Sequence, residues 1–284
     1  MTDLLLVTCA AFADGEPGHE ALDRALADRG ISARWVLWDD PEVDWSSALV
    51  AVRATWDYDT RLEEFLGWAR SVPRILNGAD VFAWNTDKAY LVELAAAGLP
   101  VVPTISVDGE EELPAALAEF DEAVVKPRVG AGGRGVVVFD GVDGGPAGLD
   151  ESELSPGPWI VQPLVASVRT EGEYSVYVLG GEPRSMVRKR PVGDEIRVHE
   201  QYGGSTDAVP RTAEAAGLAR SAVIAAEQVL GARLDYARVD LLRLADGTLA
   251  VSELEVTEPG LYLDIVPENG PAFAALVAGI LAAG

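Results

Sequence analysis

The sequence predicts an α/β domain built on a doubly wound parallel sheet, followed by a larger α+β region. Residues 1–100 alternate short apolar runs with amphipathic segments, which is the rhythm of successive β-α-β units. Beyond about residue 100, β-rich runs follow one another with short turns. The chain of 284 residues has room for both parts, because single domains usually hold about 100–200 residues.

In the N-terminal domain, apolar runs mark the strands, and glycine or proline marks where helices end. The expected strands are residues 3–8, 33–38, 47–53 and 74–78. One helix is expected from residue 19 to residue 29, where Gly30 follows it. A second helix is expected at residues 88–98, and a glycine and a proline close it.

Beyond residue 100, runs of β-branched residues predict strands and alanine-rich segments predict helices. The expected strands are residues 123–127, 135–140, 159–165, 174–179 and 184–190. Residues 141–158, rich in Gly, Pro and Ser, are expected to form an exposed connection. The remaining expected elements are a helix at 211–231, a β-hairpin at 237–256 and a final helix at 271–283.

The composition excludes several classes of partner and site. The chain carries 22 basic and 46 acidic residues, a formal net charge of −24 and a pI near 4.3. A field of that sign repels phosphate backbones and anionic lipid, so we expect no nucleic-acid partner and no membrane partner. The single cysteine, Cys9, excludes an internal disulfide, and the two histidines argue against a histidine-rich zinc site.

Targeting signals are also absent from the sequence pattern. The apolar run at residues 4–13 lacks the preceding Lys or Arg of a secretory signal, and Asp3 stands where positive charge is expected. No run approaches the roughly 18 apolar residues of a membrane span. We therefore expect the run to be a buried first strand and the protein to be cytoplasmic.

A glycine-rich loop at residues 130–135 is a candidate phosphate-binding element. Its sequence, GAGGRG, matches the G-x-G-x-x-G pattern, but a dinucleotide-binding fingerprint requires a helix after the loop and here a strand follows. Val136 and Val137 stand where a Walker A loop needs Lys and Ser or Thr. What remains is a flap between two strands that can lay backbone N–H groups on a triphosphate, with Lys126 on the incoming strand. A plain hairpin turn is the alternative.

The hairpin at 237–256 predicts a metal site. If residues 246–247 form a two-residue turn, Asp240 faces Glu253 and Arg238 faces Glu255, and all four side chains project from one face. Opposed carboxylates repel each other unless a cation lies between them. Oxygen ligands without histidine or thiolate favour Mg²⁺ or Mn²⁺. The alternative is an ordinary solvated acidic face.

Two further groups of residues are candidates for substrate binding. The basic residues of the first lie on and just after the strand at 184–190, which leads to Gly203 and Gly204, and they could bind phosphates and a substrate carboxylate. They are Arg188, Lys189 and Arg197. The second group follows a parallel strand, where an open α/β sheet presents its ligand crevice. It comprises Arg53, Trp56 and Tyr58. Surface charge balance and ordinary packing are the respective alternatives.

An ordered series of motifs resembles the ATP-grasp superfamily of carboxylate–amine ligases over nearly the whole chain. The motifs are NTDK (85–88), VVKP (124–127) with the glycine flap, IVQPLV (160–165), RVD (238–240) and ELE (253–255). RATWDY (53–58) and ELEVTEP (253–259) resemble the members that cyclise O-ureido-serine to D-cycloserine, and glutathione synthetase is similar too. One departure is that Glu255 takes the place of an asparagine found in many members.

This resemblance implies an ATP-grasp fold in three parts. They are an N-terminal pre-ATP-grasp domain at residues 1–100, a small lobe with the flap at 101–165, and a large lobe with the metal-binding hairpin at 166–284. The resemblance also implies a nucleotide site. Its residues would be Lys88, Lys126, Gly132, Gly133, Gly135, Gln162, Pro163, Leu164, Val165 and Glu173, with Glu171 as the alternative to Glu173.

The implied activity is ATP-dependent formation of an amide bond from a carboxylate and an amine. ATP and two Mg²⁺ ions, or Mn²⁺, would bind at Asp240, Glu253 and Glu255, and an acyl phosphate would form. The catalytic residues would be Arg238, Lys126 and Arg197. The substrates would be small and of amino-acid type, joined between two molecules or within one, and a homodimer and a homotetramer both stay open. A small-molecule phosphotransferase and a non-catalytic Mg–nucleotide-binding protein are the alternatives.

Overall fold

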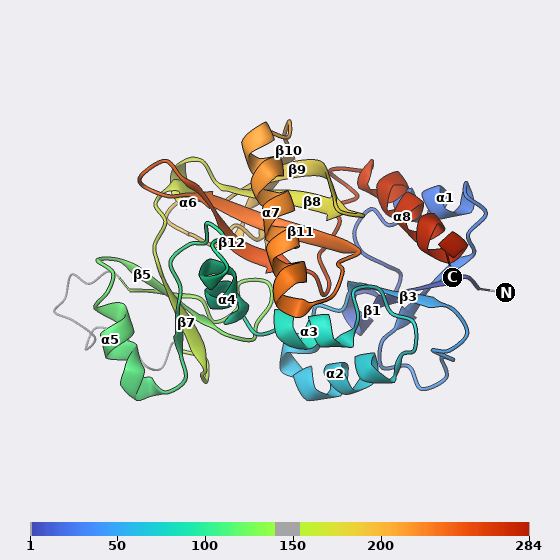
Figure 1. The fold of residues 1–284 in the computed structure, drawn as a ribbon, viewed down its shortest axis with the longest axis horizontal. Coiled ribbons are helices and arrows are strands. Elements are labelled where there is room, and N and C mark those ends of the chain that lie inside the picture. Colours follow the sequence, from blue (N-terminus) through green and yellow to red (C-terminus); the bar gives the residue numbers. More distant parts are fainter. Residues whose placement is uncertain (1, 140–153, 284) are drawn as a thin grey trace.

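The computed structural model describes residues 2–139 and 154–283, and it begins with a parallel sheet (Figure 1). Its strands are β1 (Leu4–Thr8), β2 (Ala33–Leu37) and β3 (Leu49–Ala54), in the order β2-β1-β3. All three are parallel, as the β-α-β rhythm predicts. The expected connection at 141–158 lies outside the described residues from 141 to 153.

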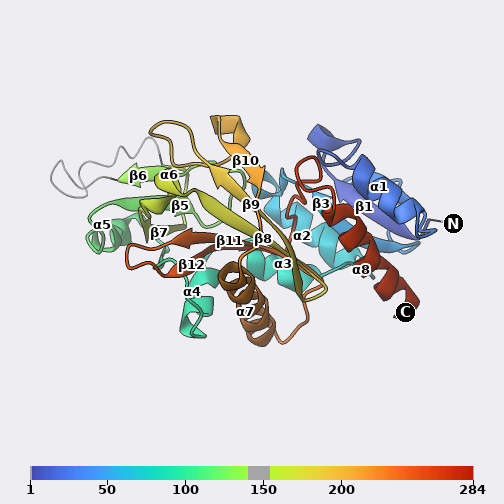
Figure 2. The same cartoon turned by 90° about the horizontal axis from the view of Figure 1, so that it is seen from above.

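Helices cover both faces of this sheet because successive residues of β1 point in opposite directions. Leu4 and Leu6 pack with α1 (Glu20–Ala27) and α8 (Asn269–Ala283). The intervening Leu5 and Val7 pack with α2 (Leu62–Ser71) and α3 (Ala79–Asn85). The predicted doubly wound α/β domain is therefore confirmed, with the C-terminal helix lying beside α1 (Figures 1 and 2).

The expected fourth strand at 74–78 is wrong. Only Ile75 bridges to Val50, as an isolated parallel bridge. At Asn77 the backbone turns into the left-handed region, with φ of 63°. The Asn77 amide then donates to the carbonyl oxygens of Tyr236 and Val256 at 2.9 and 2.7 Å. The pairing with β3 therefore ends after Leu76, and Asn77 ties the segment to residues 236 and 256 instead.

A second, four-stranded antiparallel sheet follows. Its strands are β4 (Ile105–Val107), β5 (Ala123–Pro127), β6 (Val137–Phe139) and β7 (Trp159–Pro163), in the order β4-β7-β5-β6. The short helix α5 (Leu113–Leu117) packs on one face of it and completes a small apolar core. On the other face, Val124, Lys126 and Gln162 line a cleft.

A five-stranded antiparallel sheet forms the centre of the molecule. Its strands are β8 (Glu173–Leu179), β9 (Glu182–Arg190), β10 (Ser205–Ala208), β11 (Tyr236–Arg243) and β12 (Leu249–Glu255), in the order β10-β9-β8-β11-β12. The helices α4 (Tyr90–Ala96) and α7 (Ala213–Leu230) pack against its apolar residues (Figure 1). The one-turn α6 (Ser167–Thr170) connects the two antiparallel sheets.

Together these sheets confirm the predicted α/β plus α+β architecture. The division at residues 100 and 165 stays a prediction. Among the described residues, no helix is both long and apolar enough to cross a membrane.

The hairpin β11–β12 has the predicted pairs but not the predicted turn. Arg238 pairs with Glu255 and Asp240 with Glu253. The Leu244 amide, however, donates to the carbonyl oxygen of Thr248, so the connecting loop has three residues rather than two. A β-bulge between Asp240 and Leu241 then shifts the register back by one residue. The two deviations cancel, so the carboxylates still face each other.

Candidate active site

A cleft of about 760 Å³ lies where the two antiparallel sheets meet the loops that follow β1 and β3. Polar side chains of the five-stranded sheet face it, while the alternate residues pack against α7. The cleft brings most of the predicted site residues together. Those that line it are Trp56, Tyr58, Lys88, Lys126, Gly132, Gly133, Gln162, Pro163, Leu164, Val165, Glu173, Lys189, Arg197, Arg238, Asp240, Glu253 and Glu255.

Five predicted site residues lie outside the lining. They are Arg53, Gly135, Arg188, Gly203 and Gly204. Arg188 points away from Lys189 because successive strand residues face opposite sides. Gly204 serves the backbone, since a Cβ there would lie 2.2 Å from the Val198 carbonyl oxygen.

Arg53 is buried with no exposed side-chain surface and connects two parts of the chain. Its Nε donates to the Glu16 carboxylate at 3.0 Å, and its Nη2 donates to the Pro259 carbonyl oxygen at 2.6 Å. Glu16 in turn accepts from the Leu261 amide at 2.7 Å. The side chain predicted to contact substrate therefore holds the loop after β12 against the N-terminal sheet.

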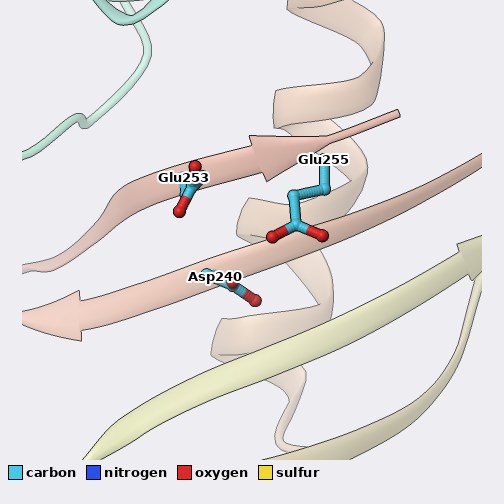
Figure 3. Close-up of side chains that lie close together, drawn as sticks. All are labelled: Asp240, Glu253 and Glu255. Atoms are coloured by element: carbon cyan, nitrogen blue, oxygen red, sulfur yellow. The ribbon is translucent and has the colours of Figure 1, made fainter. Parts of the chain in front are cut away.

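Three carboxylates converge at the centre of the cleft (Figure 3). One oxygen from each of Asp240, Glu253 and Glu255 lies within 4.8 Å of the other two. Asp240 comes from β11 and the two glutamates from β12, and all three project from one face of the hairpin. An oxygen-only set of three carboxylates suits a hard divalent cation such as Mg²⁺.

Cationic side chains compensate Asp240, which is only 1% exposed. Arg238 donates from Nε and Nη2, at 2.9 and 2.8 Å, and the Lys189 ammonium lies 3.1 Å away. Burial disfavours the ionised carboxyl, but Arg238 and Lys189 outweigh burial and lower the pKa of Asp240. Arg238 and Lys189 therefore hold Asp240 in its ionised form.

The two glutamates differ in their electrostatic surroundings. Glu253 forms an ion pair with Lys88 at 3.0 Å, and Lys88 also donates to the Gly130 carbonyl oxygen at 2.7 Å. Glu255 forms an ion pair with Arg238. Burial raises the pKa of Glu255 to about 7, although Arg238 opposes the shift. A divalent cation between the carboxylates would favour the ionised form.

Two cationic donors in the cleft have capacity for a ligand. Arg238 uses Nε and Nη2 for Asp240 and Glu255 and has no acceptor at Nη1 among the described residues. Lys126 has no hydrogen bond or ion pair from its ammonium within residues 2–139 and 154–283, and burial lowers its pKa. Arg238 lies between the buried residues Ala237 and Val239, and Lys126 follows the buried Val125, so strand alternation directs both side chains to the cleft.

The glycine flap is held over the cleft by two flanking segments. Arg134 donates from Nε to Asp59 at 3.0 Å and from Nη2 to the Trp56 carbonyl oxygen at 3.2 Å. On the other side, the Gln201 amide donates to the Gly132 carbonyl oxygen at 2.7 Å. The flap is therefore in contact with the aromatic loop after β3.

Glu173 lines the cleft, whereas Glu171, the alternative candidate for the nucleotide site, does not. The Glu173 carboxylate accepts from Lys189 at 3.1 Å and from Ser252, the bulged residue of β12, at 3.2 Å. Glu171 instead forms an ion pair with Arg243, outside the cleft lining. Lys189, predicted to contact substrate, thus joins Glu173 to the carboxylate centre.

Arg197 lies beside the flap and reaches the cleft from the loop before β10. It forms an ion pair with Glu195 at 2.6 Å and stacks 3.7 Å from the centre of the Tyr202 ring. The Arg197 guanidinium lowers the pKa of Glu195 to about 2. Its side chain is only half-buried and touches the space above Gly133.

Two further residues that line the cleft were not among the predicted site residues. Glu258 is 6% exposed and lines the cleft three residues after Glu255. Asn85 is buried and accepts from the Val256 amide while donating to the Leu254 carbonyl oxygen, which positions β12. Both lie in motifs used for the resemblance, so an acidic or amide residue at a fixed place in those motifs was the available signal.

Comparisons with known proteins agree with this fold. Residues 4–77 match the family model of the D-cycloserine synthetase DcsG N-terminal domain. The cycloserine biosynthesis protein DcsG of Streptomyces lavendulae is 31% identical over 97% of each chain. Glutathione synthetase of Synechococcus elongatus is 30% identical over 49% of this chain and 42% of its own.

Solved structures extend the likeness to the whole fold. The crystal structure of D-cycloserine synthetase DcsG superposes with a TM-score of 0.85 at 29% identity, covering 98% of this chain and 99% of that one. The ATP-grasp ligase PsnB, complexed with a precursor variant, Mg and ADP, shares the fold with a TM-score of 0.63 at 19% identity over 98% of each chain.

Fold and site thus define an ATP-grasp ligase. The chain belongs to the family of the cycloserine biosynthesis protein DcsG. The resemblance to the D-cycloserine-forming and glutathione synthetase-like members is confirmed.

Proposed function

We propose that this chain is an ATP-dependent ligase that forms a C–N bond from a carboxylate and an amine. Its reaction would be an intramolecular cyclisation of O-ureido-D-serine to D-cycloserine. The observation that carries this proposal is the convergence of Asp240, Glu253 and Glu255 beside the available donors of Lys126 and Arg238. Likeness to DcsG over 97% of both chains supports the substrate class.

The cleft suits Mg²⁺ and ATP together. The three carboxylates are the hard oxygen donors that Mg²⁺ prefers, and they lie close enough to share ions. When bound, Mg²⁺ would neutralise charge on the phosphates. We assign the phosphates to Lys88, Lys126 and the flap, and the adenosine to Glu173 and the strand end at 162–165. Two ions fit this proposal, since Glu255 adds a carboxylate to the set.

The first step would transfer the γ-phosphoryl group. A substrate carboxylate oxygen attacks the γ-phosphorus, the bond to the bridging oxygen breaks, and an acyl phosphate and ADP result. Lys126 and the flap amides would stabilise the charge on the transferring group, largely by position and electrostatics.

The second step would form the C–N bond. In O-ureido-D-serine the ureido nitrogen bound to oxygen attacks the acyl carbon, loses a proton, and expels phosphate through a tetrahedral oxyanion. The carbamoyl group on that nitrogen would then leave by hydrolysis as CO₂ and ammonia, which gives D-cycloserine. Nη1 of Arg238 is the donor that we assign to this oxyanion, because Asp240 and Glu255 fix the guanidinium and leave that nitrogen without an acceptor among the described residues. Arg197, beside the flap, would contact the leaving phosphate.

The test is incubation of the purified protein with O-ureido-D-serine, ATP and Mg²⁺. We expect D-cycloserine by mass spectrometry, with ADP and phosphate formed in equal amounts. Arg238→Ala should slow the reaction about 10²–10³-fold, the usual effect of losing one oxyanion donor. ADP with a stable phosphorylated product and no free phosphate would instead indicate a phosphotransferase. Mg–ADP binding without turnover of any carboxylic acid would indicate a non-catalytic protein.

A further inference from the structure

Glu258 is a buried carboxyl group that faces the cleft without a partner. Its side chain is 6% exposed, and its carboxylate makes no hydrogen bond or ion pair within the part of the chain that the structure describes. The other central carboxylates of the cleft are engaged by cations, for example Glu253 by Lys88 and Asp240 by Arg238. A buried carboxyl group without a hydrogen-bond or ion-pair partner is energetically unfavourable unless a ligand supplies one.

The backbone that carries Glu258 is held firmly from the N-terminal domain. The Trp56 indole donates to the Glu258 carbonyl oxygen at 3.1 Å, and Arg53 donates to the carbonyl oxygen of the next residue, Pro259. The Leu261 amide is bound by Glu16. The position of Glu258 is therefore set before any ligand arrives, while its carboxylate stays available.

Glu258 also lies next to the carboxylate centre without belonging to it. Only Asp240, Glu253 and Glu255 form the close group of oxygens among the described residues. Burial, reinforced by the charge of Glu255, raises the pKa of Glu258 to about 8, and Lys88 opposes the shift. Lys88 pairs with Glu253 and Arg238 pairs with Asp240 and Glu255, and neither pairs with Glu258 among the described residues, so the surroundings of Glu258 favour an incoming positive charge.

We propose that Glu258 binds the α-ammonium group of an amino-acid substrate. This inference rests on the proposed ligase function and names the feature that selects the substrate. In an α-amino acid, one carbon atom separates the ammonium from the carboxylate, so the two groups need adjacent binding positions. Glu258, three residues after Glu255, lines the same cleft as Arg238, which we assign to the oxyanion, and Lys88, which we assign to the phosphates. Trp56 and Tyr58 line this cleft too.

The test compares amino acids with their desamino counterparts on the intact protein loaded with Mg–ADP. The probes are the common L-amino acids, D-serine and O-ureido-D-serine, each paired with the acid that lacks the α-amino group, such as 3-(ureidooxy)propanoate for the last. Binding is measured by thermal unfolding, and turnover by ADP release with Mg–ATP. Glu258→Gln keeps the shape and removes the charge. Asp264→Asn, an exposed acid of the same cleft, is the matched control.

We expect at least one amino acid to stabilise the wild type. Its desamino counterpart should bind about 10–100-fold more weakly, which is the usual loss of affinity when a hydrogen bond to a charged group is removed. Glu258→Gln should lose that preference and keep its stabilisation by Mg–ADP, while Asp264→Asn should behave as wild type. The inference is overturned if no amino acid binds, if the desamino acids bind equally well, or if Glu258→Gln keeps the preference. Glu258-dependent binding without ADP release would leave the inference standing and refute the ligase proposal.

Should Glu258→Gln fail to fold, Glu258→Asp provides the same comparison. It retains the charge on a shorter side chain, so the amino-acid preference should weaken without vanishing. An unchanged preference in that variant would also count against the inference.

Discussion

Replacing Arg53 with methionine removes the charge that compensates a buried carboxylate and leaves the apolar volume nearly filled. Arg53 and Glu16 are 0% and 1% exposed, and their 3.0 Å ion pair has little access to water. The guanidinium also lies 5.0 Å from the centre of the Phe273 ring in α8. The substitution therefore leaves Glu16 buried, with the Leu261 amide as the one remaining donor to its side chain among the described residues.

The expected cost is set by that uncompensated carboxylate. Removing one partner of a buried ion pair typically costs about 3–5 kcal/mol. At roughly 2–4 °C per kcal/mol for a chain of this size, the melting temperature should fall by roughly 6–20 °C. The double variant Glu16→Gln/Arg53→Met has neither charged partner and so leaves no buried charge uncompensated. The decrease in its free energy of unfolding should therefore be smaller than the sum of the decreases in the two single variants, by about 2–3 kcal/mol.

The assay is urea and thermal unfolding followed by tryptophan fluorescence, with Arg34→Met, an exposed arginine of β2, as control. Arg34→Met should unfold within about 0.5 kcal/mol of the wild type. Where Arg53→Met is folded it should still bind Mg–ADP, so adding Mg–ADP should still raise its melting temperature. An Arg53→Met variant of wild-type stability with a strongly raised KM for the acid substrate would refute the structural role and restore the predicted substrate contact.

Further predictions concern the metal, the flap and the buried acid. Glu253→Gln should lose the Mg²⁺-dependent part of the stabilisation by ADP, which is about 2.7 kcal/mol at a hundredfold excess of ligand over Kd. Without ligand, its free energy of unfolding should lie within about 1 kcal/mol of the wild type, because the Glu253 side chain is 30% exposed. Retained Mg²⁺ dependence would remove Glu253 from the metal site. Arg134→Ala should weaken Mg–ADP binding roughly 2–5-fold by titration calorimetry, since its contacts with Asp59 are partly exposed; unchanged affinity would show that these contacts do not matter to the nucleotide. In the empty wild type, Glu258 has its pKa raised from 4.5 to about 8, so the native state binds more protons than the unfolded state between these values. Stability should therefore fall relative to Glu258→Gln as pH rises from about 5 to 8, by up to about 1.4 kcal/mol per pH unit, and parallel pH profiles of the two proteins would contradict this.

The carboxylate centre could be predicted because period-two alternation links sequence to a face of the sheet. Val239 and Leu241 flank Asp240, and both are fully buried against α7, as the apolar pattern indicates. The predicted register is confirmed although the predicted turn is wrong, because the bulge at Ser252 offsets the longer loop. Local turn rules contain no information about such a bulge, which places Ser252 against Glu173.

The role of Arg53 and the course of residues 74–78 could not be predicted, because both depend on contacts between distant segments. Arg53 follows a parallel strand, where a ligand crevice is expected, yet it bonds to Pro259, 206 residues further along the chain. Residues 74–78 have the apolar pattern of a strand, and the amide of Asn77 diverts them toward Tyr236. In each case sequence periodicity is compatible with two interpretations, and a tertiary hydrogen bond determines which of them the structure adopts.

The most direct measurement of the central claim follows the substrate carboxylate oxygen. O-ureido-D-serine with ¹⁸O in its carboxyl group is incubated with the protein, ATP and Mg²⁺, and the released phosphate is analysed by mass spectrometry. Ligation through an acyl phosphate predicts that each phosphate carries one labelled oxygen, since the carboxylate oxygen that attacks phosphorus leaves with it. Unlabelled phosphate, or ADP formed without phosphate, would contradict the assignment of the cleft to a carboxylate–amine ligase.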